Sequence, residues 1–245
     1  MRRLFGLLVL VVGIGFAPLT LAAQQAAAAK SDSAPHVSAL APGESIQNLD
    51  KLKAELKQYH DCTCKCGCYS KDLDLQANRA IAFLRERAHR QRANEKLALV
   101  LDIDETTLSN YEEMVKADFE YQSDVFNAWV NSAKAPAIAG TLRIYKEAKQ
   151  LGLNTFFITG RPESQRTVTE QNLHSQGFDD WKQLIMRPPA QASSTALEYK
   201  SAARGDLEAQ GYKIVLNVGD QWSDLKGAHE AEYSVKYPDP YYFIK

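Results

Sequence analysis

The stretch LALVLDIDETTLSN, residues Leu97–Asn110, decides the fold because an apolar run ends abruptly in two aspartates. A continuous apolar run of this length is typical of a strand in a parallel sheet that is buried on both faces. Asp102 and Asp104 follow it, separated by one residue. In such sheets, ligands bind beyond the carboxyl ends of the strands. We therefore expect both aspartates to lie at a binding site.

Runs of the same kind recur along the chain and alternate with helical patterns. Strands are predicted at Leu97–Ile103, Leu153–Ile158, Gln183–Met186 and Ile214–Val218. Helices are predicted at Leu49–Tyr59, Leu73–Gln91, Thr141–Gln150, Pro162–Ser175, Leu197–Ala209 and Trp222–Ala231. The alternation predicts an α/β fold over residues 49–245, with a Rossmann-like parallel sheet and helices on both faces. Residues 110–136 interrupt it and are expected to form part of a small, mostly helical cap.

The N-terminal residues 1–23 have the pattern of a secretory signal peptide. Arg2 and Arg3 precede the apolar run Leu4–Phe16, and small residues follow it. We therefore expect export to the periplasm or out of the cell. The alternative is an uncleaved membrane anchor, but the run is short and broken by Gly and Pro, so no stable anchor is expected. Residues 24–48, rich in Ala, Ser and Pro, predict a flexible linker.

Further candidate groups follow the other predicted strands or begin a helix. Thr159, Gly160 and Arg161 follow the second strand, Lys200 lies near the start of a later helix, and Asp220 follows the last strand with Asp224 four residues on. Carboxylates that converge in a partly buried site repel one another, and a divalent cation removes that penalty. Oxygen ligands without clustered histidines favour a hard ion, and Mg²⁺ fits best. The formal charge of the chain, −1, offers no field for a nucleic acid polymer, so a small phosphorylated substrate must be bound by local groups.

A carboxylate nucleophile, a hydroxyl, backbone amides and a lysine beside a metal suit phosphoryl transfer through an aspartyl-phosphate. Each element alone is weak evidence, since a DxD pair is usually a loop and a helical lysine is usually solvated. The order of the elements along the chain, and their shared place at strand ends, carry the prediction.

Four segments of the chain resemble, in order, the four motifs of the haloacid dehalogenase-like superfamily. They are DIDETTLSN, FFITGRPES, the lysine of EYKSAAR, and GDQWSDL. The combination of DIDET with GDQWSDL is similar to the branch of class C bacterial acid phosphatases and plant acid phosphatases related to vegetative storage proteins (subfamily IIIB). The resemblance extends from about Tyr69 to the final PDPYYFIK.

This resemblance implies a role for each motif residue. Asp102 would be the nucleophile, and Asp104 the acid that protonates the leaving group and then activates water. Thr159 would hold a phosphoryl oxygen, and Lys200 would stabilise the charge of the nucleophile and the phosphoryl group. The metal ligands would be the carboxylates of Asp102 and Asp220, the Asp104 carbonyl, and Asp224 directly or through water.

The roles of three further residues have two interpretations each. Phe126 and Trp129, at helical spacing in the expected cap, either stack on an aromatic leaving group or are ordinary packing residues. Packing is the commoner role of such pairs. Arg161 pairs either with substrate phosphate or with an acid such as Glu163.

The four cysteines Cys62, Cys64, Cys66 and Cys68 lie outside these motifs, in CTCKCGC. In an exported protein they predict disulfides, most easily Cys62 with Cys68 or pairs that skip one cysteine. A soft metal site for Cu(I) or Zn²⁺ is the alternative.

The leading hypothesis is thus an exported, Mg²⁺-dependent acid phosphatase for small phosphomonoesters, nucleotides among them. The alternatives are a non-catalytic storage or binding protein on the same fold, a phosphotransferase that uses the same intermediate, and a metal-handling protein built on the cysteines.

Overall fold

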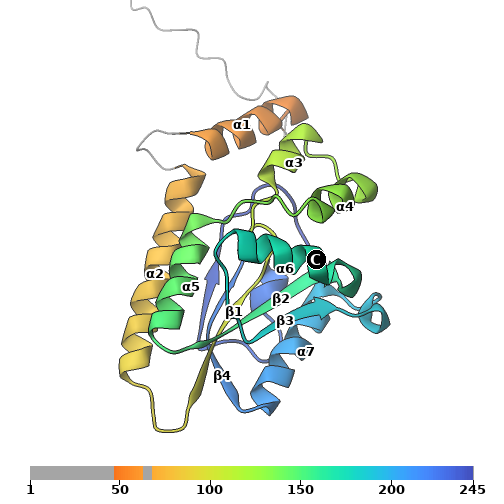
Figure 1. The fold of residues 1–245 in the computed structure, drawn as a ribbon. Helices are drawn as coiled ribbons and strands as arrows, with labels where there is room; N and C mark the ends of the chain where they lie inside the picture. The colour runs from red at the N-terminus through yellow and green to blue at the C-terminus, as the bar shows by residue number, and fades with distance from the viewer. Residues whose placement is uncertain (1–46, 63–67, 245) are drawn as a thin grey trace, which may run out of the picture. The chain divides into compact units, whose positions relative to one another are not determined.

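The central sheet has five parallel strands in a computed structural model of the protein, which describes residues 47–62 and 68–244. Their order is β3-β2-β1-β4-β5, with β1 in the middle (Figure 1). The strands are β1 Lys96–Leu101, β2 Asn154–Pro162, β3 Gln183–Arg187, β4 Tyr212–Gly219 and β5 Tyr233–Lys236. The predicted parallel α/β sheet is confirmed. The predicted signal peptide, most of the predicted linker, Cys64 and Cys66 lie outside the described residues.

Helices cover both faces of the sheet, as predicted. Side chains alternate across a strand, so Leu97, Leu99 and Leu101 of β1 pack with α2 and α5, whereas Ala98 and Val100 pack with α7. Figure 1 shows α2 and α5 together on one face. The helices are α1 Leu49–Asp61, α2 Tyr69–His89, α3 Tyr111–Lys116, α4 Ser123–Asn131, α5 Ala139–Gln150, α6 Arg166–Ser175, α7 Ala196–Ala209 and α8 Trp222–Leu225. Within the described residues, none of them is both long and apolar enough to cross a membrane.

Two predicted helix boundaries were wrong. The predicted helix Trp222–Ala231 ends at Leu225, and Gly227 beyond it has a φ of +97°, a conformation that ends a helix and favours glycine. Pro162 is the last residue of β2 and not part of the next helix, which starts at Arg166 after a 3₁₀ turn. The strand β5 was not predicted because it has four residues, most of them half-buried, with little apolar pattern.

Two short segments beside the core follow the sequence prediction in part. Residues 110–136 contain the helices α3 and α4, in line with a small helical cap. Cys62, which ends α1, forms a disulfide with Cys68, which precedes α2. The disulfide interpretation is thereby confirmed for this pair.

Candidate active site

Three carboxylates meet where β1 and β4 end. These strands are parallel neighbours, so Asp102 and Asp220 follow them at the same edge of the sheet, and α8 adds Asp224. Carboxylate oxygens of the three residues lie within 4.8 Å of one another, and all three residues are buried. Gly219 makes this possible, because a Cβ there would collide with the Asp224 side chain.

The acids are costly to ionise together. Burial, with the nearby charge of Asp224, raises the pKa of Asp102 to about 7, although Lys200 opposes this. Burial and the charges of Asp224 and Asp102 raise the pKa of Asp220 well above its usual value. Three buried, converging oxygen ligands fit a hard divalent cation, which would relieve this repulsion.

Lys200 neutralises part of this cluster. Helix α7 begins with a capping box between Thr195 and Glu198, which fixes Lys200 in its first turns. Lys200 Nζ lies 2.5 Å from Asp102 Oδ1 and also donates to Asp224 Oδ1. Burial acts to lower the pKa of Lys200, but the two carboxylates outweigh it and raise the pKa above its usual value. The structure therefore places Lys200 directly against the predicted nucleophile.

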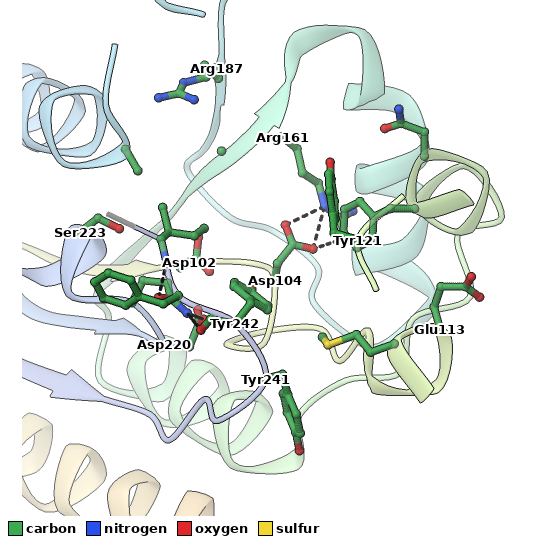
Figure 2. Close-up of a pocket in the computed structure, with 18 of the residues that line it drawn as sticks. Asp102, Asp104, Glu113, Tyr121, Arg161, Arg187, Asp220, Ser223, Tyr241 and Tyr242 are labelled. Atoms are coloured by element: carbon green, nitrogen blue, oxygen red, sulfur yellow. Dashed lines mark hydrogen bonds and ion pairs between the residues drawn. The ribbon is translucent and has the colours of Figure 1, made fainter. Parts of the chain in front are cut away.

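The carboxylate of Asp104 turns away from this cluster and pairs with Arg161 (Figure 2). Arg161 Nη2 lies 2.7 Å from Asp104 Oδ1, and Arg161 also donates to Thr169 Oγ1 at 3.2 Å. Burial acts to raise the pKa of Asp104, but the Arg161 charge and hydrogen bonds outweigh it and lower the pKa. Arg161 therefore pairs with an acid, which was one of its two interpretations, but the acid is Asp104; Glu163, the example given, pairs with Arg166.

Asn110 holds Asp104 from the other side. Its Nδ2 donates to Asp104 Oδ1 at 2.8 Å and to Glu105 Oε2 at 3.0 Å, while Trp129 Nε1 donates to Asn110 Oδ1 at 2.9 Å. Trp129 is buried and does not line the cavity, so the packing interpretation describes it better than stacking on substrate. Phe126, by contrast, does line the cavity.

The end of β2 supplies the predicted Thr159 and Gly160. Thr159 is fully buried and its Oγ1 accepts from the Arg161 backbone N–H at 3.1 Å; it is not among the residues that line the cavity. Gly160 does line the cavity, and a side chain there would meet no atom within 4 Å. Both predicted residues therefore lie at this strand end, and Gly160 faces open space.

Several residues of the site were not predicted. Glu105 is 1% exposed, and burial together with the Asp104 charge raises its pKa to about 8. Tyr242 donates its hydroxyl to Glu105 Oε2 at 3.2 Å. Gln221 donates to Asp220 Oδ2 and to Asp239 Oδ2, both at 2.7 Å, and accepts from the Ile244 N–H at 3.1 Å. Segment Asp239–Ile244 thus becomes a wall of the site, although no motif marks it.

The site contains a cavity of about 560 Å³. Asp102, Asp104, Lys200, Asp220 and Asp224 line its floor. Its apolar walls come from the cap and from the segment Asp239–Ile244, and they include Met114, Phe119, Tyr121, Val125, Phe126, Tyr241, Tyr242 and Phe243. The site can therefore hold an anion at the floor while an apolar group contacts the walls.

Comparison with known proteins identifies the class. The family model of HAD superfamily, subfamily IIIB (acid phosphatase), matches residues 20–245, so the chain belongs to this family and the predicted resemblance is confirmed. The class C acid phosphatase of Bacillus anthracis shares the fold, with a TM-score of 0.66 at 22% identity over 80% of this chain and 86% of that one.

Plant proteins are similar in sequence. Acid phosphatase 1 of Solanum lycopersicum is 43% identical over 148 residues, 59% of this chain and 58% of that protein. Vegetative storage protein 1 of Arabidopsis thaliana is 32% identical over 149 residues, 59% of this chain and 54% of that protein. The chain spans less than two thirds of the length of either relative.

Proposed function

We propose that this protein is an exported, Mg²⁺-dependent acid phosphatase that hydrolyses small phosphomonoesters, nucleotides among them, through an aspartyl-phosphate. The observation that carries the proposal is the contact of Lys200 Nζ with Asp102 Oδ1 beside the cluster of Asp102, Asp220 and Asp224. A carboxylate nucleophile needs nearby positive charge to approach a phosphate dianion, and this arrangement supplies it.

Each residue then has one task. Asp102 Oδ attacks phosphorus, and the ester oxygen departs with a proton from Asp104. Asp104 must be protonated for this step and, because Arg161 lowers its pKa in spite of burial, acidic solution supplies that proton. Asp104, again a carboxylate, takes a proton from the water that attacks the phosphoryl group on Asp102, which releases phosphate and restores both acids. Lys200 stabilises the charge on the phosphoryl oxygens. Mg²⁺, when held by Asp102, Asp220 and Asp224, would offset their charge and draw negative charge from the phosphoryl group.

A storage or binding protein is the second candidate, because one plant relative is named a vegetative storage protein. The presence of Asp102, Lys200 and Asp220 as buried neighbours, with Asp104 lining the same cavity, favours catalysis. Transfer of the phosphoryl group to an alcohol would use the same residues as hydrolysis. The metal-handling alternative is weakened, because the disulfide occupies the sulfur atoms of Cys62 and Cys68.

The test is phosphate release by the purified mature protein from an aryl phosphate and from a 5′-nucleotide, with Mg²⁺ and with EDTA. We expect turnover that requires the metal, and an added alcohol that accepts phosphate would reveal transfer. Absence of turnover across acidic to neutral pH with several divalent metals would favour the binding protein. Mass spectrometry of the secreted chain would test removal of residues 1–23.

A further inference from the structure

The cations that line the cavity are not equivalent. They are Arg161, Arg187 and Lys200. Arg161 is paired with Asp104, and Lys200 with Asp102 and Asp224. Arg187 forms no ion pair with any carboxylate in the described part of the chain. Its charge is therefore available to a ligand.

The guanidinium of Arg187 is nevertheless held in place. Arg187 is the last residue of β3, its Nη2 donates to the Ser194 carbonyl oxygen at 2.7 Å, and its guanidinium lies over the Tyr199 ring, 5.3 Å from the centroid. Its Nε is buried and has no acceptor among the described residues. A fixed guanidinium with unused donors is suited to bind an oxyanion, because little conformational entropy is lost on binding.

A second unused donor lines the same cavity. Ser223 is 4% exposed, and its Oγ has no partner among the described residues. Figure 2 shows Arg187 and Ser223 on one side of Asp104, with Tyr121 and Glu113 on the other. Glu113 and Glu120 line the cavity on the cap side, where they repel anions. Arg187, the lining cation without a carboxylate partner among the described residues, thus lies on the other side of Asp104 from Glu113.

Resting on the phosphatase function proposed above, we infer that the Arg187 side of the cavity binds a second oxyanion carried by the leaving group of the substrate, a carboxylate or a further phosphate. Lys200 and the carboxylate cluster serve the phosphoryl group that is cleaved, so Arg187 and Ser223 are available for this additional group. The preferred substrates are accordingly phosphomonoesters with two anionic groups, and Arg187 determines that preference.

The experiment compares kcat/KM for 2-, 3- and 4-carboxyphenyl phosphate with that for the matching carboxamides, and for 1,3-phenylene bisphosphate with that for phenyl phosphate. We expect the wild-type protein to prefer the anionic member in at least one pair. Arg187→Gln should lower that preference about tenfold, the value of one charged hydrogen bond, and Ser223→Ala about threefold. Arg187→Lys should restore part of it, and Arg143→Gln, which alters an exposed arginine paired with Asp74, should leave it unchanged.

The two anion types separate the ligand sources: preference among the carboxyphenyl compounds indicates a carboxylate, and preference for the bisphosphate a second phosphate. If Arg187→Gln slows both members of every pair equally, Arg187 serves the cleaved phosphoryl group and the inference is overturned. Equal wild-type rates within every pair would overturn it as well, while leaving the phosphatase function intact. Failure to release phosphate from any of the compounds would contradict the phosphatase function itself.

Discussion

Asp102 and Asp104 lie two residues apart, yet the protein surrounds them with opposite environments. Asp102 belongs to a cluster of acids, and burial raises its pKa to about 7. Asp104 lies beside Arg161 and Asn110, and its pKa is lowered. The two carboxylates that follow β1 therefore have different partners. That of Asp102 belongs to the cluster of acids, and that of Asp104 pairs with Arg161. The proposed roles need the opposite protonation, an ionised Asp102 and a protonated Asp104, so they depend on a cation at the Asp102 cluster and on acidic pH. Each role can be tested separately.

The largest effects should come from removing each carboxylate in turn. Asp102→Asn should lower turnover by about 10⁴-fold or more for every ester, because no nucleophile remains. Asp104→Asn should cost about 10²–10⁴-fold for an alkyl phosphate and much less for 4-nitrophenyl phosphate, whose leaving group needs no proton. Phosphate release measures both. Equal losses on the two esters for Asp104→Asn would contradict its role as the acid, and Asp74→Asn, an exposed acid on α2, is the control.

The next largest effect is on protein stability, through the ion pair between Arg161 and Asp104. Arg161→Met should lower the free energy of unfolding by about 3 kcal/mol, because it leaves a largely buried carboxylate without its partner. Asp104→Asn added to Arg161→Met should recover a large part of this loss. Denaturant unfolding of the two single variants and the double variant measures the coupling. Additive losses would mean that the pair is not coupled, and Arg143→Met, which breaks an exposed pair, should cost less than about 1 kcal/mol.

The acids around Asp102 predict how metal and pH act on stability. In metal-free protein the folded state holds Asp102 protonated up to a pKa of about 7, well above the usual 3.8, so stability falls as pH rises from about 4 to 7. A divalent cation bound to the ionised cluster, as proposed above, would remove this loss. The gain in Tm on replacing EDTA with Mg²⁺ should therefore be larger at pH 7.5 than at pH 5. A gain that is larger at pH 5, or absent at both, would contradict a cation site at these residues.

The strands and the motif residues could be predicted because their signals are local. An apolar run that ends in acids marks β1, and Asp220 follows the apolar run of β4 in the same way, whereas Lys200 lies in the first turns of the helix α7. The network around Asp104 could not be predicted in the same way. Glu105 and Asn110 acquire their roles only when α3, α4 and the segment Asp239–Ile244 fold back onto the loop after β1.

The partner of Arg161 illustrates the same limit. Glu163 is two residues from Arg161 in the sequence, whereas Asp104 is 57 residues away and becomes its neighbour because β1 and β2 are adjacent parallel strands. The acid nearest in sequence is therefore not the one that Arg161 pairs with. Distances along the chain say little about pairs formed between strand ends, and such pairs set the charge of this site.

The smallest effect distinguishes support of Asp104 from contact with substrate within the cap. Trp129→Phe removes the N–H that holds Asn110 and leaves a buried acceptor without a donor, so it should lower the free energy of unfolding by about 1 kcal/mol. We expect it to reduce kcat about threefold, because Asp104 is misplaced, and to leave KM unchanged.

Phe126 lines the cavity, so Phe126→Leu should instead raise KM for aryl phosphates about threefold, because an apolar contact with the substrate is lost. Steady-state kinetics of the two variants separates these outcomes. If Trp129→Phe raised KM and left kcat and stability unaltered, Trp129 would contact the substrate, and Asp104 would be held by Arg161 and Asn110 without help from Trp129.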